Sequence, residues 1–349
     1  MHICLIVNPR AGRNSGLASA QAAERVLSAA GWEITRRLTQ GPGDAIRLAR
    51  EAAAEGFAAV FACGGDGTLS QVLTGLLDSG VPAGFIPAGT GNDLARTLGL
   101  SRDPATAARQ LLAGGPAPVD LLELNGGELW AVNVMGVGFD AAVSVRINRR
   151  RRLTGGLPAY LAAVGQELVS YRPTRLSLQV DGERWEGEVL LAAVANAQSY
   201  GAGMRIAPQA VVDDGLLDVV VVQALSRPAF LRAFPRVLRG THLSHPAVLT
   251  WRGRRVTVET PEPQPVLVDG DVQCTTPLRV EVAPGRAQLW RPGPELVAAE
   301  GPAAPTRDIT MRPPGLPTTA LSLERARRCT LRLPTTGRAP RNRGRRGRQ

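Results

Sequence analysis

The sequence lacks lysine and has few histidines and cysteines, and each shortage argues against a class of chemistry. All 41 basic residues are arginine, so phosphate charge must be met by Mg²⁺, arginine and backbone N–H groups rather than by a lysine. The 3 histidines are too few for a histidine-based metal site. We expect His242 and His245, beside Pro246, to lie in a surface loop. The 4 cysteines show no CxxC spacing, which argues against zinc and disulfides and leaves buried thiols.

Long apolar runs are also missing. No stretch approaches the roughly 18 to 20 residues that span a bilayer. The run Ile3 to Val7 is too short for a signal peptide. At 349 residues and 44% hydrophobic content, the chain is long enough for two domains with their own cores. We therefore expect a cytoplasmic protein.

Positive charge is concentrated near the C-terminus. Residues 293–349 hold twelve arginines against four acidic residues, which accounts for +8 of the net charge of +11. This segment is too polar to form a core and is predicted to be a disordered Arg/Pro-rich tail. A second basic run, Arg149 to Arg152, precedes the apolar and glycine-rich stretch 153–157. Both regions predict peripheral contact with an anionic membrane, and a solvated surface without a partner is the alternative.

The chain is organised around a glycine-rich loop at residues 63–70. An apolar run precedes it, and apolar residues at 69, 72, 73, 76 and 77 follow at helical spacing. Gly64, Gly65 and Gly67 let backbone N–H groups approach an anion at the start of a helix, which is typical of a phosphate site. Asp66 would repel a phosphate unless a cation lies between them, so the loop indicates a Mg²⁺ nucleotide.

A second loop of the same kind follows the short apolar run 83–87. It contains Gly89, Thr90 and Asp93, and helical spacing resumes after it. In an open parallel sheet, successive strand-to-helix loops emerge at the same edge, so Asp66 and Asp93 should face one crevice.

These two loops resemble the diacylglycerol kinase catalytic domain, the family of soluble bacterial lipid kinases and sphingosine kinases. The resemblance rests on Gly64 to Thr68 and on Pro87 to Asp93, and it extends over about residues 3–292. NAD kinases share only the first motif. The resemblance implies an N-terminal Rossmann-like three-layer α/β nucleotide domain at 1–122 and a C-terminal antiparallel β-sandwich lipid-substrate domain at 123–292, whose last strand returns to the first domain. The tail occupies 293–349.

The resemblance also implies nucleotide contacts outside the two loops. Asn8 lies in Asn8-Pro9-Arg10-Ala11-Gly12, which is similar to a family element with serine in place of Ala11. Thr39 matches a family position near the nucleotide. With the glycine-rich loops, the predicted nucleotide contacts are Asn8, Thr39, Gly64, Gly65, Asp66, Gly67, Thr68, Gly89 and Thr90. Asn133, Gly138 and Asp140 match a further family segment, in which Asn133 would contact substrate or nucleotide.

From residue 175 onward, short strands separated by Gly, Asp and Pro turns predict the antiparallel domain, with a helix at 228–239. The turn at Asp214 resembles a family element that binds a structural Mg²⁺ through that carboxylate and the carbonyls of Val211 and Leu216. An ordinary turn is the alternative. Asp269-Gly270 predicts a hairpin. In the family a Glu, proposed as the catalytic base, stands at the position of Asp271.

The sequence thus predicts an ATP- and Mg²⁺-dependent lipid kinase with Asp271 as base and Asp66 and Asp93 as magnesium-binding catalytic residues. Diacylglycerol at a membrane surface is the expected acceptor, and a lipid tail would lie between the sheets or under the helix at 228–239. The alternatives are NAD kinase activity, or a catalytically weak membrane or nucleic-acid binding protein that uses its arginine-rich tail. No specific nucleic acid is expected as a partner, and a homodimer is left open.

Overall fold

The computed structural model describes residues 1–149, 157–201 and 203–293. Most of the second arginine run, the apolar and glycine-rich stretch up to residue 156, Cys329 and the arginine-rich tail beyond residue 293 lie outside these residues. The disorder and the membrane contacts expected for these segments therefore stay predictions.

The N-terminal lobe is built on a parallel sheet of short apolar strands. Its order is β4 (Ala83–Pro87), β3 (Ala59–Gly64), β1 (His2–Val7) and β2 (Glu33–Leu38). Residues Ile3 to Val7 and the whole of β3 and β4 are buried. This pattern is typical of a sheet covered on both faces, and it explains why these strands read as continuous apolar runs.

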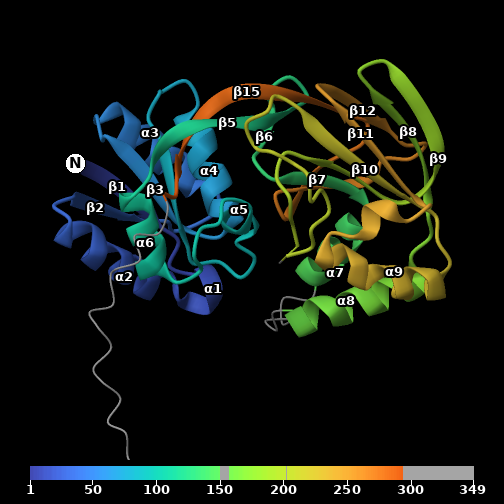
Figure 1. Cartoon of the computed structure of the whole chain (residues 1–349), viewed down its shortest axis with the longest axis horizontal. Coiled ribbons are helices and arrows are strands. Elements are labelled where there is room, and N and C mark those ends of the chain that lie inside the picture. Colours follow the sequence, from blue (N-terminus) through green and yellow to red (C-terminus); the bar gives the residue numbers. More distant parts are fainter. Residues whose placement is uncertain (150–156, 202, 294–349) are drawn as a thin grey trace, which may run out of the picture. The chain divides into compact units, whose positions relative to one another are not determined.

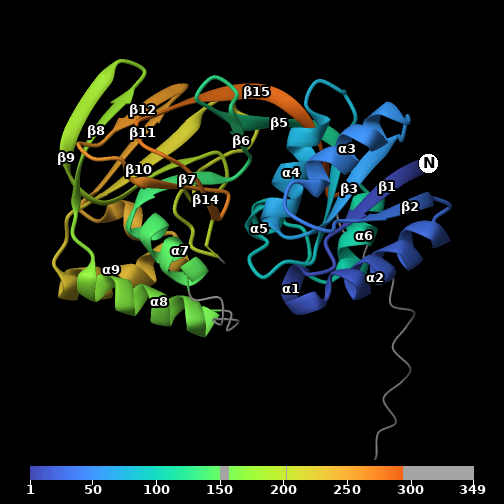
Figure 2. The ribbon, with the colours of Figure 1, turned by 180° about the vertical axis from the view of Figure 1, so that it is seen from behind.

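Helices form the outer two layers of this lobe (Figures 1 and 2). On one face α2 (Gly16–Ala29) packs against α6 (Pro104–Leu112), and on the other α3 (Asp44–Ala54) packs against α4 (Asp66–Leu76). The helix-spaced residues Leu69, Val72, Leu73 and Leu76 of α4 are buried, as their spacing predicts. The short helices α1 (Ala11–Asn14) and α5 (Asp93–Thr97) follow the loops after β1 and β4.

Two long strands connect the N-terminal and C-terminal lobes. β5 (Gly115–Leu124) pairs antiparallel with β15 (Leu278–Arg291), and β15 also lies parallel to β4 through Leu289 and Ala83. Figure 1 shows both strands crossing between the lobes. β15 extends to Arg291, because its second half pairs with the start of β5 after an irregularity between Ala283 and Ala287.

The C-terminal lobe consists of antiparallel strands, which confirms the predicted fold class. Their pairings are β7 with β9 and β13, β9 with β8 and β10, β10 with β11, β12 with β8 and β15, β13 with β14, and β5 with β6. The strands are β6 (Leu129–Ala131), β7 (Val134–Gly138), β8 (Thr174–Val180), β9 (Glu183–Ala195), β10 (Leu217–Gln223), β11 (Val248–Gly253), β12 (Arg255–Glu259), β13 (Pro265–Val268) and β14 (Asp271–Thr275). A core of alternating Val and Leu side chains lies between them.

Three helices cover one face of this lobe: α7 (Phe139–Arg149), α8 (Leu157–Ser170) and α9 (Arg227–Arg239). Phe139 and Phe230 join α7 to α9 through ring centroids 5.3 Å apart. Among the described residues, no helix is both long enough and apolar enough to cross a membrane.

The prediction that His242 lies in a surface loop was wrong. His242 starts a 3₁₀ turn (His242–Ser244) and is 2% exposed, with Nε2 3.0 Å from the carbonyl oxygen of Ile206. Burial lowers the pKa of this histidine. Pro246 correctly signalled a turn, but the sequence does not show that the turn packs inward against the segment around Ile206.

Candidate active site

The two glycine-rich loops meet at the carboxyl edge of the parallel sheet. The amide N–H of Ala88 donates to the carbonyl of Gly64 at 2.7 Å. A Cβ placed on Gly89 would lie 2.4 Å from the Cα of Gly65, so the two backbones touch without room for a side chain. This contact brings Asp66 and Asp93 to one crevice.

Asp66 joins the loops through its carboxylate. Oδ2 accepts a hydrogen bond from the backbone N–H of Asp93 at 3.0 Å, and Oδ1 accepts one from Leu94 at 2.9 Å. These donors belong to the first turn of α5, where backbone N–H groups otherwise lack partners and a negative charge is stabilised. Asp66 therefore holds the second loop in place, a role that the sequence did not reveal.

The other predicted catalytic acid of this crevice, Asp93, is 5% exposed and forms an ion pair. Its Oδ1 lies 2.7 Å from Nη1 of Arg96, one helical turn later. Arg96 thus brings a positive charge to an otherwise acidic crevice.

Two of the predicted nucleotide residues, Asn8 and Thr68, support the first glycine-rich loop. Asn8 donates from Nδ2 to Oγ1 of Thr68 at 3.3 Å, and the Thr68 side chain fills the space next to Gly64. Thr39 follows β2, and its N–H donates to the carbonyl of Val7. None of Asn8, Thr39, Gly64, Thr68 and Gly89 lines the cavity described next.

A polar cavity of about 330 Å³ lies between the glycine-rich loops and the β13–β14 hairpin. It brings together seven of the predicted residues, namely Gly65, Asp66, Gly67, Thr90, Asp93, Asn133 and Asp271. Its other lining residues are Gly91, Asp140, Ser144, Tyr200, Gly201, Leu267, Asp269 and Gly270. The volume is within the usual range of ligand pockets.

The hairpin that carries Asp271 is confirmed. Asp269 and Gly270 both have positive φ, at 47° and 99°, as a tight two-residue turn requires. The Asp271 carboxylate faces the first loop, because a Cβ on Gly67 would lie 3.9 Å from its Oδ2. Partial desolvation by the surrounding protein raises the pKa of Asp271.

Asp269 fixes the hairpin against the rest of the lobe. Its buried carboxylate accepts hydrogen bonds from the backbone N–H groups of Val132, Asn133 and Val134 at 2.9, 2.9 and 3.2 Å. Burial raises the pKa of Asp269 to about 6, although these hydrogen bonds act in the opposite direction. A carboxylate with three backbone donors is a rigid support for the neighbouring Asp271.

Two buried oxygens of the cavity lining have no hydrogen-bond partner in the described part of the chain: Oδ1 of Asn133 and Oδ2 of Asp140. Burial raises the pKa of Asp140 to about 6. A Cβ on Gly136 would lie 1.9 Å from Oδ2 of Asp140, so glycine is needed there for this carboxylate to fit. Unpaired buried polar atoms are costly and mark sites where a ligand can bind.

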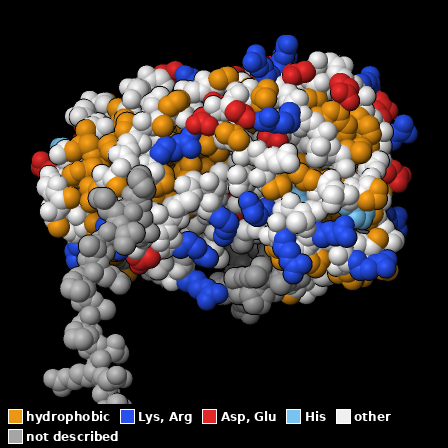
Figure 3. Space-filling model, in the orientation of Figure 1, with side chains coloured by type: hydrophobic (Ala, Val, Ile, Leu, Met, Phe, Trp, Pro, Cys, Tyr) orange, Lys and Arg blue, Asp and Glu red, His pale blue; other side chains and the backbone are white. Residues whose placement is uncertain are grey.

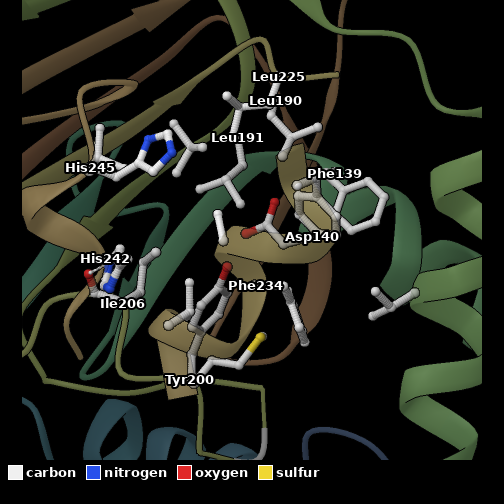
Figure 4. A pocket seen from close by; sticks show the side chains of 17 residues that line it. Phe139, Asp140, Leu190, Leu191, Tyr200, Ile206, Leu225, Phe234, His242 and His245 are labelled. Carbon is white, nitrogen blue, oxygen red and sulfur yellow. Dashed lines mark hydrogen bonds between the residues drawn. The ribbon is translucent and has the colours of Figure 1, made fainter. Parts of the chain in front are cut away.

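Asp140 also lines a second, apolar cavity of about 50 Å³ beneath α9. Phe230, Ala233, Phe234 and Val237 of α9 cover it, and His242 lies at its side. Figure 4 shows the Asp140 carboxylate and the Tyr200 hydroxyl facing each other among these apolar side chains. Asp140 and Tyr200 line both cavities and therefore mark their junction.

The predicted structural metal site holds an arginine. Oδ2 of Asp214 is hydrogen-bonded to Nη2 of Arg252, while Oδ1 accepts from the N–H of Leu216 at 3.1 Å. Arg252 also lies 3.3 Å from Asp218. A guanidinium already neutralises the carboxylate that was expected to bind Mg²⁺, so the assignment of Val211, Asp214 and Leu216 stays a prediction.

The polar cavity itself suits a metal nucleotide. Five aspartates line it, Asp66, Asp93, Asp140, Asp269 and Asp271, and no arginine is among its lining residues in the described chain. Because Arg96 neutralises only Asp93, polyphosphate needs further cations to approach the other four carboxylates. Among the described residues no group of three or more acidic, histidine or cysteine side chains is arranged as a metal site, so Mg²⁺ would reach this cavity together with the nucleotide phosphates.

Sequence reasoning gave no role to Asp269, Tyr200 or Ser144. Asp269 was noted only as part of a turn, and its buried partners come from the junction of β6 and β7, more than 130 residues away. Nothing in the local sequence distinguishes Tyr200 from a core residue.

Comparisons with known proteins agree with this architecture. Residues 2–124 match the model of the diacylglycerol kinase catalytic domain, and residues 133–291 match the YegS C-terminal NAD kinase beta sandwich-like domain. The chain is 36% identical to a Mycobacterium tuberculosis protein named diacylglycerol kinase, over 83% of this chain and 95% of that protein.

Two further comparisons agree with this similarity to diacylglycerol kinases. A Bacillus subtilis diacylglycerol kinase is 31% identical, over 76% of this chain and 88% of its own length. A crystal structure from Bacillus anthracis str. Sterne matches with a TM-score of 0.69 at 27% identity, over 83% of this chain and 95% of that one. The chain therefore belongs to the family of lipid kinases that combine a diacylglycerol kinase catalytic domain with a YegS-type C-terminal domain, and it is a lipid kinase.

Proposed function

We propose that this lipid kinase transfers the γ-phosphoryl group of ATP to the hydroxyl of diacylglycerol. The observation that carries the proposal is the position of Asp140 at the junction of two cavities. One cavity is polar and bounded by the glycine-rich loops, and the other is apolar. A diacylglycerol has one hydroxyl at the end of two apolar chains, so its polar end and its tails match the two environments.

The nucleotide phosphates would bind at the glycine-rich loops, where backbone N–H groups are the available donors. Gly65, Gly67 and Thr90 line this part of the polar cavity. Mg²⁺, when bound, would neutralise phosphate charge next to the five aspartates. Asp66 would keep the second loop in register with the first through its bonds to Asp93 and Leu94.

Asp271 would act as the general base. As the lipid hydroxyl oxygen bonds to the γ-phosphorus, the bond from that phosphorus to the β–γ bridging oxygen breaks and ADP leaves. The hydroxyl proton passes to the Asp271 carboxylate. Two features support this role: the carboxylate faces Gly67, and Asp269 fixes the hairpin that carries it.

The Asp140 carboxylate and the Tyr200 hydroxyl would orient the glycerol part of the acceptor. The apolar cavity at about 50 Å³ is smaller than the roughly 300 Å³ of an ordinary ligand pocket. An acyl chain would therefore need α9 to move away from the sheet. Such a shift would break the backbone hydrogen bond from the N–H of Arg205 to the carbonyl of Val237, near the end of α9.

The alternatives explain fewer of these features. A NAD kinase would have no use for an apolar cavity beside its acidic one. A binding protein without activity would have no use for Asp271 on a fixed hairpin. The reported relatives are named diacylglycerol kinases, which also favours the lipid acceptor.

The decisive experiment follows label from γ-labelled ATP, with Mg²⁺, into dispersed diacylglycerol, phosphatidylglycerol, a sphingoid base and NAD. We expect label in diacylglycerol, and loss of labelling in Asp271→Ala. Ala233→Phe fills the apolar cavity, so it should impair long-chain diacylglycerol more than a short-chain one. Label in another lipid would overturn the acceptor, and equal impairment for both chain lengths would overturn the acyl site.

A further inference from the structure

The outer face of α9 exposes apolar side chains to solvent. The inner residues Phe230, Ala233, Phe234 and Val237 line the apolar cavity. Further around the helix Leu231 is 59% exposed and Leu238 is 42% exposed, and Pro235 between them is exposed as well. Positions 231, 235 and 238 are spaced i, i+4, i+7, so they form one stripe along the helix.

A stripe of arginines runs beside it. Arg232, Arg236 and Arg239 have the same spacing and are all exposed. Within the described residues, none of the three forms an ion pair with a carboxylate. Residues 224–245, which include α9 and both its flanks, contain no acidic residue. We call the apolar and arginine stripes together the α9 outer face.

A further exposed apolar side chain lies at the end of α8. Val169 is 68% exposed, and Arg227 at the start of α9 donates to the carbonyls of Leu168 and Val169, with 3.0 Å to Leu168. This link holds the end of α8 next to the start of α9. Figure 3 shows basic side chains gathered over the region of α9, with hydrophobic side chains among them.

We propose that the α9 outer face docks on an anionic lipid bilayer. An amphipathic helix with exposed leucines beside unpaired arginines combines the two attractions that hold a helix at a bilayer surface, namely apolar burial and charge. A nucleic acid would use the arginines but would leave the leucines exposed. A second copy packed symmetrically would bring arginine against arginine.

Docking of the α9 outer face would bring the apolar cavity close to the bilayer that holds the lipid substrate. The same helix covers the apolar cavity with one face and would contact the bilayer with the other. A lipid could then pass from the bilayer to the cavity without crossing water. The inference rests on the lipid kinase family and on α9, and it does not depend on which lipid is the acceptor.

The test attaches an environment-sensitive fluorophore to the full chain at Leu231→Cys or, as a control, at Leu38→Cys on β2. Leu38 is also exposed, at 46%. Cys4 and Cys63 are buried, so only Cys274 and Cys329 need replacement by Ser in both proteins. With vesicles of equal parts phosphatidylglycerol and phosphatidylcholine, we expect a blue shift at position 231 and none at position 38. Phosphatidylcholine vesicles should give a smaller shift.

This design separates α9 from the arginine-rich tail. If the tail alone binds vesicles, the protein will sediment with them but the label at position 231 will not shift, and the proposal fails. It also fails if the protein does not bind vesicles at all, or if DNA shifts the label while vesicles do not.

The second measurement compares how strongly variants partition onto the same vesicles. Replacing Arg232, Arg236 and Arg239 by Gln should weaken partitioning about a hundredfold, from roughly 1 kcal/mol per arginine near an anionic surface. The matched control replaces Arg175, Arg184 and Arg255 on β8, β9 and β12. The double variant Leu231→Ser with Leu238→Ser should weaken partitioning at least about tenfold. Its control is the double variant Leu17→Ser with Leu38→Ser. Equal partitioning of test and control variants would contradict the proposal.

Discussion

The carboxylate of Asp66 accepts a hydrogen bond from the backbone N–H of Leu94 at 2.9 Å, across 28 positions of sequence. With its second bond, to the N–H of Asp93, it fixes the start of α5 to the first glycine-rich loop. Asp66 is therefore a structural connection between the two phosphate loops as well as an acid of the polar cavity.

Asp66→Asn should impair both stability and turnover. The amide keeps one acceptor oxygen but presents a donor to the second N–H, so the variant loses a charge-assisted hydrogen bond. We expect a loss of about 1–2 kcal/mol in the free energy of unfolding and at least about a hundredfold in kcat, from misplaced loops. Denaturant unfolding and phosphoryl-transfer assays measure the two effects. Unchanged stability would show that these hydrogen bonds contribute nothing.

Gly89→Ala should separate the two loops. The new Cβ would approach the Cα of Gly65 to 2.4 Å, a backbone contact that no rotamer relieves. We expect a loss of about 1–3 kcal/mol in stability, as for overpacked sites, and a higher KM for ATP. Gly115→Ala is the matched control, because nothing lies within 4 Å of a Cβ there. Similar behaviour of the two variants would contradict the close contact of the loops.

Asp271→Ala should lower kcat about 10²- to 10⁴-fold with little change in KM for ATP, as expected for removal of a general base. The base must be ionised, and the pKa of Asp271 is raised by desolvation. The acidic limb of the wild-type kcat profile should therefore have its midpoint above the ordinary value for aspartate, with activity rising as pH rises. Asp271→Glu should keep such a limb. A profile in Asp271→Ala that matches wild type would exclude this residue as the base.

Asp140→Asn should stabilise the protein while lowering its activity. The pKa of Asp140 is raised by burial to about 6, so the folded protein keeps a proton that the unfolded chain releases from about pH 4 upward. Wild-type stability contributed by this group is complete below about pH 4 and is lost as pH rises through about 6. At about pH 7.5 the variant should be more stable by roughly 2–3 kcal/mol, at about 1.4 kcal/mol per pKa unit.

Unfolding of Asp140→Asn by denaturant at low and neutral pH checks this prediction. The difference from wild type should nearly vanish at about pH 3, because the wild-type Asp140 carboxyl is then largely neutral in both the folded and the unfolded chain. Asp269 titrates in the same range in both proteins and cancels in the comparison. A variant less stable than wild type at neutral pH would mean that the Asp140 carboxylate is well paired in the folded protein.

Much of the fold could be predicted from the sequence, because the signals are local. The buried strands β1, β3 and β4 appear in the sequence as apolar runs, and the spacing of its leucines predicts α4. The Asp269-Gly270 dipeptide predicts the hairpin. Each of these features depends on residues within a few positions of one another, whose conformational preferences the sequence displays directly.

The site could be predicted only in part. The glycine spacing and the acids Asp66, Asp93 and Asp271 indicated a shared crevice, and all three line one cavity. The sequence did not reveal that the side chains of Asn8 and Thr68 are hydrogen-bonded, or that Arg252 is hydrogen-bonded to the carboxylate of Asp214. Those contacts join residues dozens of positions apart.

By itself, the sequence determined the glycine-rich loops, the alternation of strands and helices, and the absence of lysine, since these follow from residue identity and spacing. Only the tertiary structure decided that Asp140 joins a polar to an apolar cavity, that His242 is buried, and that α9 presents arginines and leucines outward. The physical reason is that burial and desolvation depend on which distant segments pack around a side chain. A carboxylate or a histidine reads the same in sequence whether it faces water or a closed core.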